Sequence, residues 1–295
     1  MELSRFRGTG VALVTPFKEN GDIDHDKLSE HVERAIAGGV EFLVPSGTTG
    51  ESATLSADEQ RELVGAVADA ADRRVPVMAG AGTNDTRDAV ALAEGARRAG
   101  ADAILSVSPY YNKPAPSGLF AHYQAIASVV DVPVFVYNVP GRTGSNITPG
   151  TLLRLAEIEN VKGVKEASGD LEQVMEIIGS RPDEFLVLSG DDALTLPMVA
   201  AGADGVISVA ANEAPEAMSE MVRAALAGDL ERARELHYRL LPLMRANFLE
   251  TNPVPVKTAL ELMGHLTAYF RLPLVPLGSE RREELKVALQ KAGLL

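Results

Sequence analysis

The sequence predicts an α/β protein folded as a (β/α)8 (TIM) barrel with a C-terminal helical extension. Three observations support this prediction: eight short apolar runs recur along the chain, amphipathic segments separate them, and one phrase occurs three times. The phrase, Ala-Gly followed by a buried apolar run, begins at Ala37, Ala99 and Ala201. Apolar strands that alternate with amphipathic helices indicate parallel strands covered by helices, and eight units favour a closed barrel over an open doubly wound sheet.

The strands are expected at intervals that fit one strand and one helix each. The first strand is expected over Val11 to Val14 and the sixth over Val161 to Lys165. Proline opens the runs at Pro76 and Pro133, a position that a strand tolerates. Predicted starts, separated by 19 to 35 residues, lie near residues 11, 41, 76, 102, 133, 161, 185 and 204.

The intervening segments repeat their apolar residues with a helical period. Ser56 followed by Glu59 predicts a capping box, and Thr148 before Pro149 predicts another helix start. These start signals lie where the spacing of the strands requires helices.

After residue 207 the chain continues for 88 residues, more than one closing helix needs. Periodic stretches, with a linker at Pro273 to Pro276 between the last two, predict helices within 213–227, 229–247, 254–263 and 279–293. We therefore expect a catalytic barrel over residues 1–223 and a C-terminal helical region over residues 224–295.

The composition excludes several function classes. With 28 Lys and Arg against 41 Asp and Glu, the formal net charge of −13 argues against nucleic acid and anionic membranes as partners. The absence of cysteine excludes disulfides and a cysteine nucleophile, and the five histidines do not cluster at metal-ligand spacing. No apolar run approaches the roughly 20 residues that span a bilayer, and the N-terminus has no apolar signal core. We expect a soluble, cytoplasmic protein.

Reactive groups in such a barrel lie where strands end and the following loops begin. Alternation along the sixth strand turns Gly163 and Lys165 to one face, taken as the interior, with Gly163 leaving space for the lysine stem and Lys162 pointing outward. Desolvation lowers the pKa of an amine and makes it nucleophilic, so Lys165 suggests a Schiff base with a carbonyl substrate. The alternative is a lysine that extends from the barrel mouth into water.

Polar residues also end the neighbouring strands. Tyr137 ends the fifth strand and suits proton transfer, with a core-filling tyrosine as the alternative. After the second strand, the loop 46–52 offers backbone and hydroxyl donors to a small carboxylate, with Glu51 holding its shape, although a plain turn uses similar residues. Tyr110 and Tyr111 follow the fourth strand and suit either an oligomer contact or catalysis.

Five motifs in order resemble those of the dihydrodipicolinate synthases, also called 4-hydroxy-tetrahydrodipicolinate synthases, in the pyruvate-dependent class I aldolase family. The similarity runs from about residue 7 to the C-terminal helices. The motifs are GTTGES at 47–52, SPYYNKP at 108–114, YNVPGRTG at 137–144, GVKEASGD at 163–170 and SGDDAL at 189–194.

This resemblance implies a Schiff-base lyase of lysine and diaminopimelate biosynthesis. It implies that Lys165 forms the imine with pyruvate. Tyr137, Thr48 and Tyr111 would form a proton relay in which Tyr111 reaches across a dimer interface. No metal or organic cofactor is implied, and the expected assembly is a homotetramer built as a dimer of dimers.

The resemblance also implies where both substrates bind. Thr49 and its loop would hold the pyruvate carboxylate. Arg142 would bind the carboxylate of the second substrate, L-aspartate 4-semialdehyde, because a guanidinium suits bidentate pairing. The backbone at Gly190 and Ile207 would complete the pocket.

Two other functions remain as alternatives. One is an N-acetylneuraminate lyase or 2-keto-3-deoxysugar acid aldolase of the same family, and the other is a catalytically silent barrel that binds a small carboxylate. Many relatives are inhibited by lysine near the tyrosine pair and the second helix, where a histidine often contacts it. Here that helix reads Ala57-Asp58-Glu59-Gln60 and Asp88 replaces the usual glutamate, so weak or absent inhibition is expected.

Overall fold

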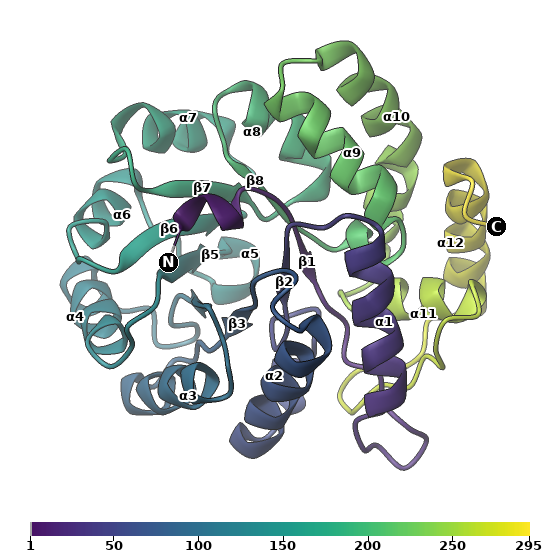
Figure 1. Cartoon of the computed structure of the whole chain (residues 1–295), viewed down its shortest axis with the longest axis horizontal. Helices are drawn as coiled ribbons and strands as arrows, with labels where there is room; N and C mark the ends of the chain where they lie inside the picture. The colour runs from purple at the N-terminus through teal and green to yellow at the C-terminus, as the bar shows by residue number, and fades with distance from the viewer. Residues whose placement is uncertain (1) are drawn as a thin grey trace.

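The structure, a computed structural model, describes residues 2–295 and confirms the predicted barrel (Figure 1). Its parallel strands are hydrogen-bonded in the order β2-β1-β8-β7-β6-β5-β4-β3. Between β2 and β3 the amide of Leu43 donates to the carbonyl of Pro76 at 3.0 Å, and this bond closes the barrel. The strands are β1 (Gly8–Ala12), β2 (Phe42–Val44), β3 (Met78–Gly80), β4 (Ala103–Val107), β5 (Val134–Asn138), β6 (Val161–Glu166), β7 (Leu186–Ser189) and β8 (Gly205–Ser208).

Helices follow the strands and surround them, as Figure 1 shows. Ser56 and Glu59 form the predicted capping box, with both reciprocal bonds present. Pro149 opens a helix as predicted, although the Thr148 hydroxyl contacts that of Thr151 at 3.1 Å and caps no backbone amide. The helices of the barrel are α1 (His25–Ala37), α2 (Ala57–Ala71), α3 (Thr86–Arg98), α4 (Pro116–Ala127), α6 (Pro149–Leu155), α7 (Leu171–Ser180), α8 (Thr195–Ala200) and α9 (Pro215–Leu226).

Short helical turns lie between these elements. One precedes the barrel and the others follow β2, β5, β7 and β8. They are η1 (Leu3–Phe6), η2 (Ser52–Thr54), α5 (Pro140–Thr143), η3 (Asp192–Leu194) and η4 (Ala210–Asn212).

The predicted C-terminal helices are also present: α10 (Leu230–Ala246), α11 (Val254–Leu262) and α12 (Ser279–Ala292). One apolar cluster runs from α1 and α2 through α9 and α10 to α12, so these helices share a core with one side of the barrel. Residue 223 lies within α9, and the division at that residue stays a prediction. No helix within residues 2–295 has the length and apolar character needed to cross a membrane.

The prediction for the first strand was wrong in its position. Val11 to Val14 was expected, whereas β1 begins three residues earlier, at Gly8. The reason is the packing around Gly10, because a Cβ there would lie 2.1 Å from the ring of Phe42. The start of β1 is therefore built of small residues that leave room for a large ring inside the barrel, and an apolar pattern does not reveal it.

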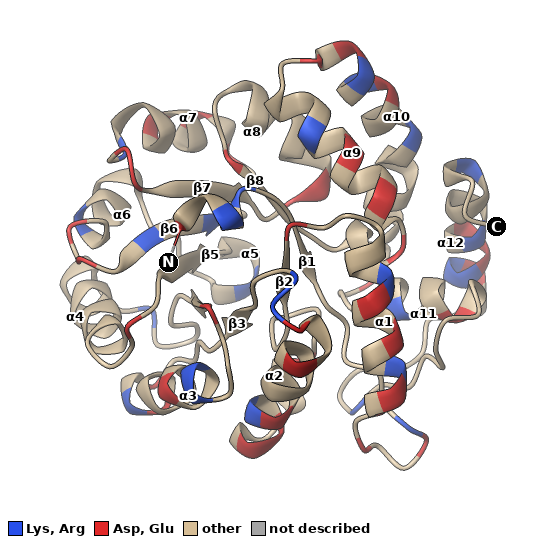
Figure 2. Ribbon diagram, viewed as in Figure 1, with Lys and Arg blue, Asp and Glu red and all other residues tan. Residues whose placement is uncertain are grey.

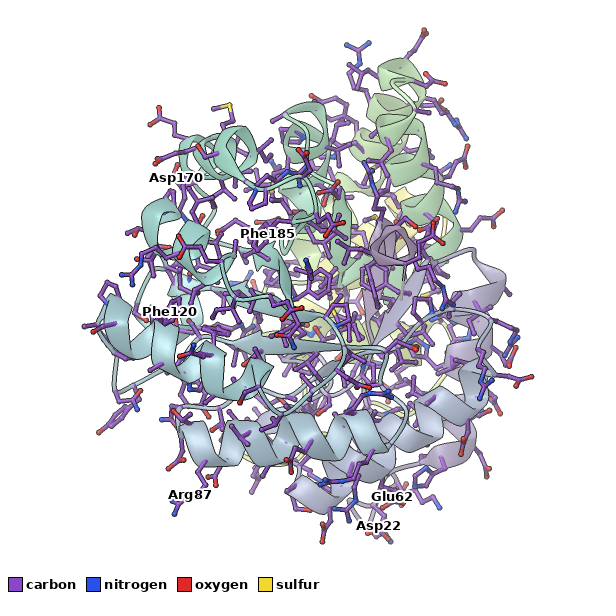
Figure 3. All side chains as sticks on the ribbon, turned by 60° about the vertical axis from the view of Figure 1, so that its left-hand side comes forward. Asp22, Glu62, Arg87, Phe120, Asp170 and Phe185 are labelled. Atoms are coloured by element: carbon purple, nitrogen blue, oxygen red, sulfur yellow. The ribbon has the colours of Figure 1, made fainter. Side chains whose placement is uncertain are left out.

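Aromatic rings fill the N-terminal end of the barrel. The ring of Phe6, on η1, lies 5.7 Å from that of Phe42 and 5.6 Å from that of Phe135, both edge to face. Charged residues gather on the surrounding helices (Figure 2). The side chains of Arg87 and Glu62 project outward, whereas that of Phe185 lies among packed side chains (Figure 3). The N-terminal end of the barrel is thus a packed core, and space for chemistry remains at the other end.

Phe6→Ala is expected to lower the free energy of unfolding by about 3 to 5 kcal/mol, because it leaves a cavity between two rings. Phe248→Ala, which removes a half-exposed ring, is the matched control and is expected to cost less than about 1 kcal/mol. Urea unfolding followed by circular dichroism measures both. An equal loss in the two variants would contradict the role given to Phe6.

Candidate active site

Lys165 and Tyr137 lie side by side at the carboxyl ends of β6 and β5. The strand register pairs them directly, and Leu188 of β7 is the partner of Lys165 on its other side. The lysine side chain is only 6% exposed, and its Nζ lies 4.3 Å from the centroid of the Tyr137 ring. Among residues 2–295 the amine has no carboxylate partner. The arrangement is a buried amine, free of an ion pair, beside a phenol.

A glycine gives the lysine stem its space, but it is not the predicted one. A Cβ at Gly163 would lie 2.5 Å from the ring of Phe135, so that glycine accommodates the ring. At Gly190 a Cβ would lie 3.1 Å from Cε of Lys165. The Gly190 amide donates to the carbonyl of Glu166 at 2.8 Å, which keeps this backbone against the lysine.

The loop after β2 is tightly folded and largely buried. The amides of Gly50 and Ser52 donate to the carbonyl of Gly47 at 3.1 and 3.3 Å, and the Thr15 hydroxyl donates to the carbonyl of Gly50 at 2.6 Å. Thr49 Oγ1 accepts a bond from Nδ2 of Asn252 at 2.9 Å. The loop is therefore an ordered turn in which a hydrogen bond fixes the hydroxyl of Thr49.

A groove of about 760 Å³ opens at this end of the barrel. Thr48, Asn252 and Arg142 line it, so the loop after β2, α5 and the C-terminal region meet there. Nη2 of Arg142 donates to the carbonyl of Asn252 at 3.4 Å, and the rest of the guanidinium is exposed. The groove extends along α2 and α3, where Val64 and Leu92 line it, and neither Lys165 nor Tyr137 is a lining residue. It therefore presents a cation and a hydroxyl near the loop after β2.

Tyr110 and Tyr111 differ in their surroundings. The hydroxyl of Tyr110 lies 3.4 Å from that of Thr83 and the residue lines the groove. Tyr111 is 89% exposed and has a φ of 70°, in the left-handed region. A single chain therefore does not bring Tyr111 to Lys165, and its role in the relay stays a prediction that needs a second copy of the chain.

A buried polar network fixes the ends of β5 and β6, one residue beyond the tyrosine and the lysine. Nδ2 of Asn138 donates to Oε2 of Glu166 at 3.0 Å. Oε1 of Glu166 accepts from the Ser168 amide at 2.7 Å, and Oδ1 of Asn138 accepts from the Ile147 amide at 3.0 Å. This network anchors both following loops, and neither member was among the predicted site residues.

The loop after β7 supports the remaining predicted residues. Ile207 lies on β8 in the same apolar cluster as Tyr137. Beyond it, Oδ2 of Asp192 accepts from the amides of Val209 and Ala210 at 3.0 and 2.9 Å. Burial raises the pKa of the Asp192 carboxyl, and its second oxygen has no partner in the described residues. Asp192 ties the loop after β7 to the end of β8.

The chain is similar to known proteins over nearly its whole length. The family model described as the Dihydrodipicolinate synthetase family matches residues 5–292. The chain belongs to this family. A 4-hydroxy-tetrahydrodipicolinate synthase from Chlorobium phaeobacteroides (strain BS1) is 51% identical over 100% of both chains. The dihydrodipicolinate synthase structure from Thermotoga maritima is 45% identical, with a TM-score of 0.96, over 99% of this chain and all of that one.

These matches confirm the predicted family and the class I aldolase type of enzyme. One further solved relative is a monomeric dihydrodipicolinate synthase variant, 44% identical with a TM-score of 0.97 over 99% of both chains. Membership of the dihydrodipicolinate synthetase family therefore leaves the assembly of this chain open.

Asn252 was not among the predicted site residues, because its local sequence resembles an ordinary loop before a helix. The residue is buried, it lines the groove, and its Oδ1 has no partner within residues 2–295. Polarity alone does not distinguish it from surface asparagines. Asn138 and Glu166 could have been predicted from the sequence, because each is a polar residue that directly follows a candidate catalytic residue, on neighbouring strands.

Proposed function

We propose that the chain is a 4-hydroxy-tetrahydrodipicolinate synthase that condenses pyruvate with L-aspartate 4-semialdehyde through a Schiff base on Lys165. One observation carries the proposal: in a chain of this family, a buried amine without a carboxylate partner lies 4.3 Å from a tyrosine ring at the open end of the barrel. The names of relatives about 50% identical over the whole chain support this activity. A place in lysine and diaminopimelate biosynthesis follows from the same reaction.

The first half of the reaction forms the imine. The Lys165 amine attacks the keto carbon of pyruvate, and the carbinolamine loses water to give a protonated imine. Tyr137 and Thr48 move the protons that this step requires, and Tyr111 of a second copy connects them to solvent. The loop that carries Thr49 receives the pyruvate carboxylate through its amide and hydroxyl donors.

The second half forms the carbon–carbon bond. The pyruvate methyl group loses a proton to give an enamine, with the imine nitrogen as the electron sink. The enamine carbon adds to the aldehyde carbon of L-aspartate 4-semialdehyde, and the new oxygen takes up a proton. The amine of the added unit then attacks the imine carbon and displaces Lys165. The ring closes, the free amine is regenerated and one water is released overall.

Arg142 favours this reaction over cleavage of sugar acids. Its guanidinium lies at the groove and, within residues 2–295, makes one hydrogen bond, a long one to a backbone carbonyl, so it can pair with a substrate carboxylate. An N-acetylneuraminate lyase or a 2-keto-3-deoxysugar acid aldolase instead binds a polyhydroxylated chain. A catalytically silent barrel has no need for an unpaired buried amine.

Borohydride reduction with pyruvate, followed by peptide mass spectrometry, tests the imine. The expected result is a pyruvate adduct on Lys165 alone. A substrate panel then separates the enzymes, and turnover of L-aspartate 4-semialdehyde but of no sugar acid is expected. An adduct on another residue, or none, would favour the silent barrel, and cleavage of a sugar acid would favour the aldolase.

The proposal includes a homotetramer in the cytoplasm. The exposure of Tyr111 supports one part of this proposal, the pairing of two chains, because the proposed relay requires that residue from a second chain. The tetramer and the location follow from the resemblance alone. Sedimentation velocity measures the assembly, and a fully active monomer would contradict the role given to Tyr111.

Free lysine is expected to inhibit weakly or not at all. The second helix begins Ala57-Asp58-Glu59-Gln60 and offers no histidine to a bound lysine. Steady-state rates measured over a range of lysine concentrations test this expectation. Half-inhibition of the purified protein at submillimolar lysine would contradict it.

A further inference from the structure

The C-terminal region reaches the loop after β2 through a buried ion pair. Nζ of Lys257, on α11, lies 2.6 Å from Oε1 of Glu51, and both side chains are fully buried. The ammonium also donates to the carbonyl of Tyr269 at 2.6 Å and lies 4.4 Å from the ring centroid of Phe17. Two oxygens and an aromatic face therefore fix the position of this cation.

Glu51 belongs to the turn that carries Thr48 and Thr49. Its amide donates to the carbonyl of Thr48 at 3.1 Å, and its φ is 56°, in the left-handed region. A residue with a Cβ is strained in that conformation. The turn therefore persists only because contacts elsewhere hold Glu51, and its carboxylate makes the strongest of them.

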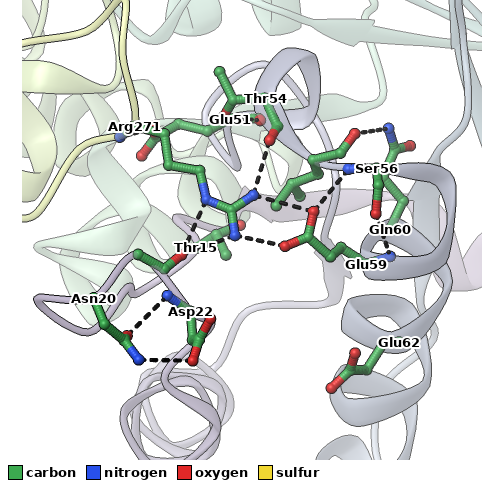
Figure 4. A network of polar contacts seen from close by, with 12 residues as sticks. Thr15, Asn20, Asp22, Glu51, Thr54, Ser56, Glu59, Gln60, Glu62 and Arg271 are labelled. Carbon is green, nitrogen blue, oxygen red and sulfur yellow. Dashed lines mark hydrogen bonds and ion pairs between the residues drawn. The ribbon is translucent and has the colours of Figure 1, made fainter.

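Arg271 attaches the same loop at further points, as Figure 4 shows. Its Nη1 donates to the carbonyl of Thr54 at 2.8 Å, and its amide contacts Oε2 of Glu51 at 3.4 Å. The guanidinium also pairs with Glu59 in the capping box of α2, and this pairing lowers the pKa of the Glu59 carboxyl to about 2. The C-terminal region thus holds the C-terminal side of the loop and the start of α2.

Stability alone does not account for a fully buried Lys257 and Glu51. Removing two charges from water is unfavourable, and apolar residues of similar size often replace such a pair without loss of stability. The 2.6 Å contact between the two charged groups fixes the relative position of Lys257 and Glu51, which an apolar contact would not do.

We propose that Lys257 is a positioning residue for pyruvate capture, acting through Glu51 on the turn that carries Thr48 and Thr49. The inference rests on the proposed function, because it takes pyruvate as the ligand of that turn. It also gives the C-terminal helices a catalytic role, since their contact sets the geometry of a loop 206 residues earlier.

The test compares Lys257→Met with the double variant Glu51→Gln/Lys257→Met. The single variant leaves a buried carboxylate without a partner and is expected to melt earlier, whereas the double variant regains stability because no charge remains. Both are expected to need at least about tenfold more pyruvate for half-maximal borohydride trapping, because small displacements of a binding group cost that much or more. The KM for L-aspartate 4-semialdehyde should change less than about threefold, since Arg142 lies outside this turn.

Two controls complete the design. Glu51→Gln alone keeps an oxygen that accepts from Lys257, so it should raise the pyruvate requirement less than the double variant does. Arg181→Met breaks the pair between Arg181 and the buried Asp204, which lies before β8 at the other end of the barrel. That variant should lose stability without a change in pyruvate dependence.

The outcomes separate this inference from the proposed function. A wild-type protein that forms no adduct on Lys165 rejects both. If the wild type forms the adduct and the double variant traps pyruvate at the wild-type concentration, the positioning role is wrong while the function stands. Failure of every variant at the pair to fold would show that the pair serves the fold itself, which also overturns the inference.

Discussion

Lys165→Met is expected to lower the rate of product formation by at least about four orders of magnitude, because the amine that forms the imine with pyruvate is removed. The protein should remain folded. Methionine has nearly the length of the lysine stem, and the amine that it replaces is buried beside Tyr137 without a carboxylate partner. Initial rates with both substrates measure the loss, and intact-protein mass spectrometry after borohydride treatment should find no pyruvate adduct.

Lys162→Met is the matched control, since it changes the same residue type on the same strand. Lys162 is part-exposed and pairs with an exposed Glu184 at 3.3 Å. Such a surface pair contributes about 0 to 1 kcal/mol, so stability and rate should stay close to those of the wild type. If Lys165→Met retained the wild-type rate, or if Lys162→Met lost it, the lysine assigned to the chemistry would be wrong.

The barrel was predictable because local patterns determine it. Each apolar run predicts a strand and each amphipathic segment predicts a helix, and eight such units predict a closed barrel. The error at β1 also arose from reliance on local patterns. The ring of Phe42, which is distant in the sequence, fills the space beside Gly10, so a glycine is needed there and the apolar pattern is interrupted. An apolar sequence pattern reveals buried side chains, and a glycine that makes room for another residue's side chain has none to reveal.

The candidate site was predictable only in part. Tyr137 and Lys165 end consecutive strands, and consecutive strands of a barrel are neighbours, so their pairing follows from the topology. Asn252 lies 203 residues from its partner Thr49, and Lys257 lies 206 residues from Glu51. No local pattern encodes such contacts, because they depend on how the C-terminal helices pack against the barrel.

Arg142→Leu is expected to separate the two halves of the reaction. Pyruvate capture should continue, with the concentration for half-maximal trapping within about threefold of the wild type, because the loop that holds pyruvate does not include Arg142. The value of kcat/KM for L-aspartate 4-semialdehyde should fall by about 10²-fold or more, the effect of losing a charge-assisted pair of roughly 3 kcal/mol.

Arg154→Leu serves as the control for Arg142→Leu. Arg154 lies on α6 over the ring of Phe120 and does not line the groove. Its replacement should leave both kinetic values near those of the wild type. If Arg142→Leu weakened pyruvate trapping as much as aldehyde turnover, the guanidinium would serve the first substrate or the shape of the groove. The preference for a short anionic aldehyde over a sugar acid would then need another residue.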